Sequence, residues 1–195
     1  KMSLLADYYT LHQNPEVGHL LPLTKEYLMS RLAVMDAAIY EVGTSSLVVV
    51  FDFQKETTIM YRCEMDALFL KENKKHKPCS KNNKMHACGH DAHTAILLGA
   101  IKILSELREE FDGQVMFIFQ PSEEHYPGGA ITMLNDGIFN NITPKAIFAL
   151  HTTPEIERGK IGIKEGKYMA STDEIYIEVR GKGGHGATPD LNIDP

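Results

Sequence analysis

The sequence has few cysteines and no long apolar run, and each absence excludes a class of protein. Three cysteines cannot all pair within one chain, and so small and odd a number is typical of a reducing compartment. No apolar run approaches the roughly 20 residues that a membrane span requires. The first ten residues lack the apolar stretch and cleavage site of a signal peptide. We therefore expect a cytoplasmic protein.

An excess of basic residues is also absent. The chain has 20 lysines and arginines against 26 aspartates and glutamates, which gives a formal charge of −6. Nucleic acids and membrane surfaces attract basic patches, so this balance argues against both as partners. Hydrophobic residues make up 43% of the 195 residues, which predicts a buried core. The length allows one full domain and the start of a second.

The hydrophobic pattern predicts an α/β fold. The expected helices cover residues 3–12, 24–35, 92–110 and 128–137, and the expected strands cover residues 46–53, 57–63, 114–119 and 145–150. From Ser46 onward, the order of strands, helix, strand, helix and strand favours a helix-flanked sheet that contains parallel pairs.

The composition changes near Gly159. Short strand-like segments, including residues 174–180, then alternate with glycine turns, and no long helix follows. This change predicts that the chain leaves its first domain and enters a second. The glycine-rich residues 181–189 lack the spacing of a phosphate-binding loop. Their spacing alone favours a flexible turn over a histidine held at a loop tip to reach a ligand.

Acidic and histidine side chains follow three of the predicted strands. They are Glu64 and Asp66 after residues 57–63, Glu123 and Glu124 after residues 114–119, and His151 after residues 145–150. In open α/β sheets, ligands bind outside the carboxyl ends of the strands. We therefore expect these side chains to converge at one edge of the sheet.

Residues 85–94, MHACGHDAHT, concentrate three histidines, one cysteine and one aspartate. Cys88 and His90 are two positions apart, so both side chains point the same way in an extended segment. Thiolate and imidazole are good ligands for zinc and similar divalent ions. Asp91 is placed to cap the helix that follows. A buried, inert cysteine beside a capping histidine remains the alternative interpretation.

The acidic pair Glu123–Glu124 follows a proline directly after an apolar strand. In such a loop both carboxylates can face one cleft. One can then bind a metal while the other accepts a proton from metal-bound water, which is the division of roles that hydrolysis requires. A solvated acidic turn is the alternative.

Seven segments together resemble the co-catalytic metallo-amidohydrolases of the aminoacylase and carboxypeptidase-G type. They are LHQNPEVG, YRCEMDAL, MHACGHDAHTAILLGA, FIFQPSEE, GGAITMLNDGIF, FALHTTPEIERGKIGI and VRGKGGHGATPDLNIDP, in the family's order. The subfamily they resemble most contains hippurate hydrolases, N-acyl-amino-acid deacylases and auxin-conjugate hydrolases. MHACGHDAHT is close to a signature of that subfamily.

The resemblance implies a three-layer sandwich, in which helices flank a mixed, largely parallel sheet, and the start of an inserted α+β lid domain. Residues 1–171 would belong to the catalytic domain, and residues 172–195 would form the first strand and glycine-rich loop of the lid. The family binds two divalent ions, for which zinc and manganese are the candidates. Its members form homodimers through the lid.

The resemblance also implies roles for individual residues. Cys88, His90, Glu124 and His151 would be metal ligands, and Glu123 would be the general base. The two metals would activate the water that attacks the amide of an N-acyl-amino acid or a related conjugate.

Asp66 would orient the site without binding metal, and His185 would reach a neighbouring subunit's active site and polarise the substrate. Glu64 stands where the subfamily usually has aspartate, and Phe69 where proline is common. The family supplies one more histidine ligand late in the chain, but no histidine follows His185. We therefore expect an N-terminal portion that is inactive alone, without a complete two-metal site.

Three other functions compete with this one. A dipeptidase or aminopeptidase-like enzyme would use the same metals with a different pocket. A relic of the fold would bind metal without catalysis. A cysteine hydrolase would use Cys88 with His90 or His93, but it would leave the two carboxylates and His151 without a role.

Overall fold

The computed structural model describes residues 3–53, 57–73 and 77–195. Its chain divides into two compact units, Lys1–Thr153 and Pro154–Pro195. The helices are α1 (Leu4–Gln13), α2 (Pro22–Leu32), α3 (His90–Glu106) and α4 (Gly129–Asn135), with short 3-10 turns at Arg108–Glu110 and Pro189–Leu191. The strands are β1 (Ala38–Val42), β2 (Ser46–Asp52), β3 (Thr58–Glu64), β4 (Gln114–Gln120) and β5 (Ala146–Ala149).

The first unit contains a mixed sheet of five strands in the order β1-β2-β4-β3-β5. β3 pairs in parallel with both β4 and β5, whereas β2 pairs antiparallel with β1 and with β4. The expectation of a mixed sheet is confirmed. β1, β3, β4 and β5 run in one direction and β2 runs against them, so most strands of the mixed sheet are parallel, as expected.

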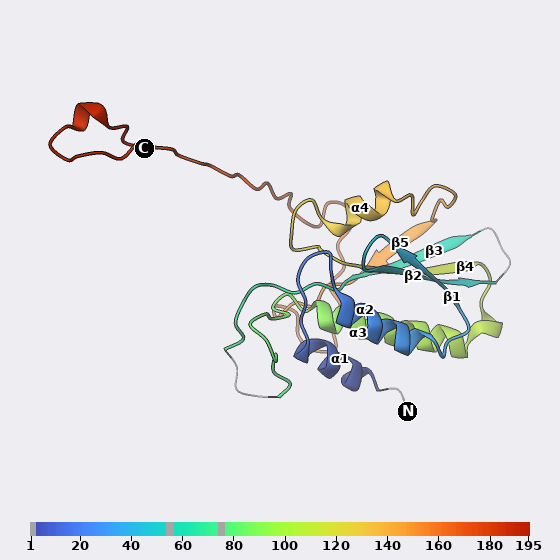
Figure 1. Cartoon of the computed structure of the whole chain (residues 1–195). Coiled ribbons are helices and arrows are strands. Elements are labelled where there is room, and N and C mark those ends of the chain that lie inside the picture. Colours follow the sequence, from blue (N-terminus) through green and yellow to red (C-terminus); the bar gives the residue numbers. More distant parts are fainter. Residues whose placement is uncertain (1–2, 54–56, 74–76) are drawn as a thin grey trace. The chain divides into compact units, whose positions relative to one another are not determined.

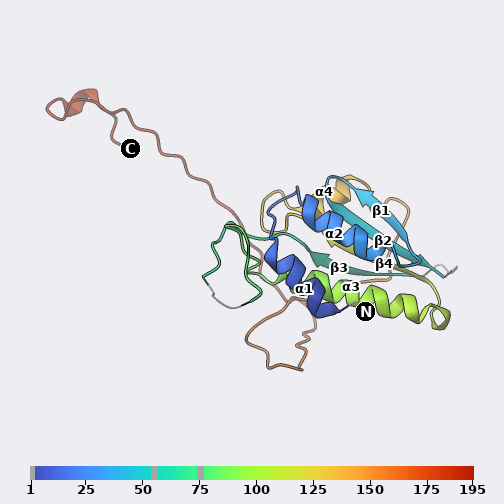
Figure 2. The same cartoon turned by 60° about the horizontal axis from the view of Figure 1, so that its bottom comes forward.

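Helices cover both faces of this sheet, so the expected three layers are present. α1, α2 and α3 lie on one face and α4 lies on the other (Figures 1 and 2). The larger core joins Leu28 of α2 and Ile101 of α3 to Phe117 of β4, all nearly inaccessible to solvent. The smaller core packs Met133 of α4 against Met60 of β3 and its neighbours. Apolar burial on both faces stabilises the sheet that carries the site.

Helix α3 supplies the side chains that matter most for function. It begins at His90, directly after Gly89, whose φ of +90° is in the left-handed region that suits glycine. Asp91 accepts a hydrogen bond from the amide of Ala92 at 2.8 Å. Asp91 therefore satisfies a free amide of the first turn, as expected. It does so from inside the helix, because Gly89 occupies the capping position before His90.

No lid domain is evident in the second unit, and the expectation that it begins one stays a prediction. Residues 174–180 were expected to form a strand, but in the described chain after Thr153 no partner strand pairs with them. An extended segment becomes a strand only when a neighbour satisfies its amides and carbonyls. One isolated bridge, between Lys182 and Ile193, closes the end of this unit. The predicted boundary after residue 171 stays a prediction.

Within the described residues, no helix is both long enough and apolar enough to cross a membrane.

Candidate metal centre

The carboxyl ends of β3, β4 and β5 meet the first turn of α3. The parallel pairing places Glu64 of β3 beside Gln120 of β4, and Arg62 of β3 beside Ala149 of β5. The loops that follow these strands therefore begin at the same edge of the sheet. The convergence expected from the strand ends is confirmed.

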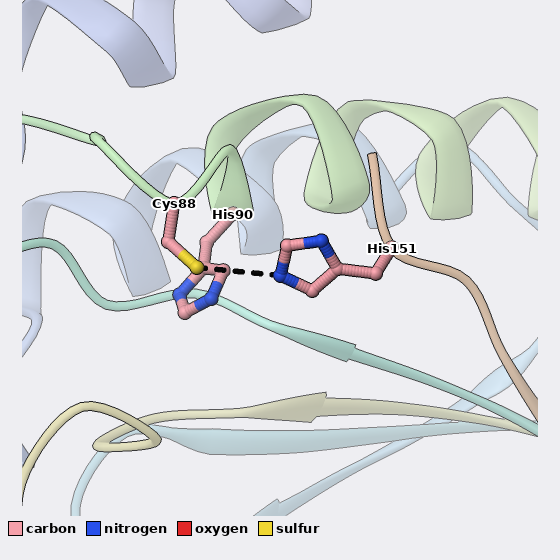
Figure 3. Close-up of side chains that lie close together, drawn as sticks. All are labelled: Cys88, His90 and His151. Carbon is pink, nitrogen blue, oxygen red and sulfur yellow. Dashed lines mark hydrogen bonds between the residues drawn. The ribbon is translucent and has the colours of Figure 1, made fainter. Parts of the chain in front are cut away.

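Cys88, His90 and His151 form the first group that could hold a metal ion. Each offers one ligand atom, and these atoms lie within 4.8 Å of one another. The Cys88 Sγ lies 3.3 Å from Nε2 of His151. Cys88 and His90 come from residues around the start of α3, whereas His151 comes from the segment after β5 (Figure 3). His90 is buried, Cys88 is half-buried and His151 is exposed. The group thus has a rigid, buried side and a side open to solvent.

His90 is oriented by the backbone of the loop after β3. Its Nδ1 lies 2.8 Å from the carbonyl oxygen of Asp66, and a carbonyl can only accept, so Nδ1 carries the proton. In the neutral ring Nε2 keeps its lone pair, and this nitrogen faces Glu123 Oε2 at 3.8 Å and Glu124 Oε1 at 4.0 Å. A ligating histidine that donates its other N–H to a carbonyl is the usual arrangement in metal sites.

The two glutamates are held by their backbone amides. Asp66 accepts hydrogen bonds from the amides of Glu123, at 2.9 Å, and Glu124, at 3.0 Å. Ser122, immediately before them, is fully buried and has a φ of +52°, a conformation that costs energy in a residue other than glycine. This turn directs both carboxylates toward His90. Asp66 therefore orients the loop of Glu123 and Glu124 through its carboxylate and the ring of His90 through its carbonyl oxygen.

The two carboxylates have different environments. The Glu123 side chain is 43% exposed, and that of Glu124 is 19% exposed. Partial burial, together with the negative charge of Glu124, raises the pKa of Glu123 above its ordinary value. A carboxylate with a raised pKa, open to solvent beside possible metal ligands, is suited to accept and return a proton.

Cys88 is unsuited to act as a nucleophile in this arrangement. Burial and the adjacent carboxylate of Glu124 raise the pKa of its thiol to about 12. Reactive cysteines need a lowered pKa, because the thiolate is the nucleophile. The same thiol would lose its proton on binding a divalent cation. The geometry therefore favours a ligand role over the cysteine-hydrolase alternative.

His93 and Glu64 form a buried pair beside these groups. The sequence placed Glu64 at this edge of the sheet but assigned neither residue a role in metal binding. Nδ1 of His93 lies 3.1 Å from Oε2 of Glu64. Burial alone would raise the pKa of Glu64, but the hydrogen bond from His93 and the charge of Arg62 lower it to about 2. The three-residue spacing between His90 and His93 puts both on one face of α3. In the sequence, this spacing was the signal that His93 lies near the proposed ligands.

The residues present fit a divalent metal. Sulfur, imidazole nitrogen and carboxylate oxygen together suit zinc and related ions. Among the described residues, the buried Oε1 of Glu124 has no hydrogen-bond partner, although a buried polar atom normally has one. This atom belongs with His90 and Glu123 to a further group whose ligand atoms lie within 4.8 Å. A cation there would satisfy it.

The structure thus brings together five of the six site residues expected from the sequence: Cys88, His90, Glu123, Glu124 and His151. Their individual roles stay predictions. His185 lies in the second unit, where its Nδ1 accepts a hydrogen bond from the amide of Ala187 at 3.1 Å. Its role toward substrate also stays a prediction.

The fold and the cluster define an α/β protein with a candidate metal centre at the carboxyl edge of its sheet. The model of peptidase family M20/M25/M40 matches residues 60–195, and the chain belongs to this family.

Relatives of known name agree with this assignment. The chain is 37% identical over 197 residues to an N-acyl-L-amino acid amidohydrolase of Geobacillus stearothermophilus, covering 100% of this chain and 53% of the relative. It is 37% identical over 189 residues to an N-acetylcysteine deacetylase of Bacillus subtilis, covering 95% of this chain and 49% of the relative. The chain therefore spans about half the length of these curated relatives.

A solved structure resembles the chain over most of its length. It is a dinuclear metal-binding peptidase of the M20 family from Bacillus subtilis, with a TM-score of 0.77 and 34% identity. The match covers 84% of this chain and 46% of that structure. The fold and the family thus agree with the resemblance that the sequence motifs indicated.

Proposed function

We propose that the protein hydrolyses the amide bond of N-acyl-amino acids or related conjugates. The observation that carries this proposal is the placement of Glu123, a half-exposed carboxylate with a raised pKa, 3.8 Å from the free Nε2 of His90. The names of the relatives, which include an N-acyl-amino acid amidohydrolase and an N-acetylcysteine deacetylase, support the substrate class.

We assign two divalent ions, zinc or manganese, to the ligands Cys88, His90, Glu124 and His151. When bound, such ions supply Lewis acidity to a water and to the substrate carbonyl. The peptidase of the same family that is described as dinuclear supports the number of ions.

Glu123 carries the proton in the proposed reaction. Its carboxylate accepts a proton from the attacking water and then delivers it to the nitrogen of the leaving amine. Its raised pKa brings it closer to the range in which it can perform both steps. Asp66 holds the backbone of Glu123 so that this carboxylate stays on the solvent side of His90. His90 keeps its Nε2 lone pair available by donating from Nδ1 to the carbonyl of Asp66.

The remaining parts of the proposal concern the whole protein. It would act as a cytoplasmic homodimer on a small-molecule substrate, without nucleic acid or membrane as partner, and His185 would polarise the scissile carbonyl. The present chain alone would be inactive, because the family's last histidine ligand is not part of it.

The test is a Glu123→Gln substitution in a protein extended to the full length of its relatives. We expect hydrolysis of N-acetyl-amino acids and N-benzoyl-glycine to fall by at least about a thousandfold, while metal content stays that of the parent. Glu109→Gln, at an exposed position in the short turn after α3, is the matched control. Full activity of Glu123→Gln would refute the assignment. Preferential hydrolysis of dipeptides by the parent would instead identify a peptidase.

A further inference from the structure

His93 lies between two segments that carry the proposed ligands. Its ring is buried in the first turn of α3, three residues after His90. Nε2 of His93 accepts a hydrogen bond from the backbone amide of Thr152 at 2.9 Å. Thr152 directly follows His151, so this bond joins the first turn of α3 to the loop after β5.

Glu64 fixes the tautomer that this bond requires. The carboxylate of Glu64 can only accept, so Nδ1 of His93 donates to it across 3.1 Å. A neutral histidine that donates from Nδ1 keeps a lone pair on Nε2, and this lone pair is what the Thr152 amide needs. The Glu64 carboxylate is itself held by an ion pair with Arg62 on the same strand.

We propose that His93 is the positioning residue that holds His151 against Cys88 and His90. The rings of His93 and His151 meet edge to face, with centroids 4.7 Å apart. The bond from Thr152 fixes the backbone beside the exposed His151, whose ring otherwise meets α3 through ring contacts with His90 and His93, and which contacts Cys88 at 3.3 Å. This inference rests on the proposed function, because the role it gives His93 is to position a ligand of the metal centre proposed there.

A direct ligand role for His93 is the competing explanation. Glu64, His90 and His93 do offer ligand atoms within 4.8 Å of one another. Both ring nitrogens of His93 are already engaged, however, one by Glu64 and the other by the Thr152 amide and by its hydroxyl at 3.1 Å. A metal at either nitrogen would have to break one of these bonds.

Two substitutions separate the two bonds of His93. The side-chain amide of asparagine reaches the position of Nδ1, so His93→Asn keeps the donor to Glu64 and loses the acceptor for Thr152. Glutamine reaches the position of Nε2, so His93→Gln keeps the acceptor and loses the donor. Matched unfolding curves of the metal-free variants show whether both still fold.

The first measurement needs no metal. In the metal-free chain, nitrogen-15 spectra are expected to show His93 protonated at Nδ1, and the Thr152 amide is expected to be protected from hydrogen exchange. His93→Asn should speed exchange at Thr152 by at least about tenfold, whereas His93→Gln should not. A proton on Nε2 of His93, or equal exchange in both variants, would overturn the proposal.

The second measurement adds Co²⁺ and follows the thiolate-to-cobalt absorption of Cys88. We expect His93→Asn to weaken Co²⁺ binding by about 10- to 100-fold and His93→Gln to weaken it less, as for other residues that support a ligand. Equal loss in both variants would contradict positioning through Thr152. Absence of the thiolate band in the parent chain would refute the ligand set of the proposed function, while the exchange data would still decide the role of His93.

Discussion

Nδ1 of His12 lies 2.6 Å from Oδ2 of Asp91, which joins α1 to the first turn of α3. The other ring nitrogen of His12 lies 3.2 Å from Oε1 of Glu72, a residue of the loop after β3. Both carboxylates are almost completely buried. His12 therefore joins α1, the loop after β3 and the first turn of α3. Its partner Asp91 is the residue next to the proposed ligand His90.

Replacing His12 by alanine should destabilise the chain by about 3 kcal/mol, because two buried carboxylates lose a partner. Urea unfolding of the metal-free chain measures this loss. Lys102→Ala removes an exposed ion pair with Glu106 on α3 and should cost less than about 1 kcal/mol. Similar losses in the two variants would show that the His12 contacts contribute no more than a surface pair.

Gly89 allows the segment that carries Cys88 to lie close to the segment after β5. A Cβ at this position would lie 2.5 Å from the hydroxyl oxygen of Thr152, and its φ is +90°. Gly18 has a comparable φ of +78° with nothing within 4 Å of the added atom. Gly18→Ala therefore measures the cost of the backbone conformation alone.

We expect Gly89→Ala to lower the unfolding free energy by at least about 1 kcal/mol more than Gly18→Ala does, because it also crowds Thr152. The same variant should weaken Co²⁺ binding, whereas Gly18→Ala should not. Equal effects of the two substitutions on stability and on metal binding would mean that Thr152 moves aside without consequence.

Glu64 should make the stability of the chain depend on acid pH. Its pKa is about 2 in the folded chain against an ordinary value of 4.5. The unfolded chain then binds the proton first as the pH falls, so the stabilisation is complete above about 4.5 and is lost progressively toward about 2.

The stability difference between the parent and Glu64→Gln should therefore be largest near neutral pH and shrink between about pH 5 and about pH 2. Unfolding curves of both proteins across this range measure it. Glu109→Gln, which replaces an exposed carboxylate, is the control for loss of a glutamate away from the site. A difference that stays constant across the range would contradict the lowered pKa.

Metal binding should release the proton of Cys88. Its thiol has a pKa of about 12 before metal binds, for which burial and Glu124 are responsible. The logarithm of the apparent Co²⁺ association constant should therefore rise by about one per pH unit between about pH 7.5 and 8.5. Cys88→Ala should bind more weakly and lose this slope. An identical slope in both proteins would exclude Cys88 as a ligand.

Much of this site was predictable because its signals are local in sequence. Cys88 and His90 lie within one short segment, and Glu123 and Glu124 directly follow an apolar strand, so their chemistry is visible without coordinates. The rule that ligands collect at the carboxyl ends of strands then correctly joined them to His151.

The parts that sequence reasoning missed depend on contacts between distant segments. Strand β1 has a weak pattern because it is an edge strand with exposed residues on both faces. The antiparallel pairing of β2 with β4 cannot be read from either strand alone. His93 resembled an ordinary residue of a first helical turn, because Thr152 and Glu64, which give it a purpose, are 59 and 29 positions away.

The position of β3 between β4 and β5 has a consequence for how the protein acquires its site. The proposed ligands at the ends of β4 and β5 reach the start of α3 only after β3 has paired on both sides. Pairings so distant along the chain form late and slowly during folding. The affinity for metal is therefore a property of the finished domain, and the isolated decapeptide MHACGHDAHT should bind far more weakly. Metal added during refolding should therefore stabilise the completed domain.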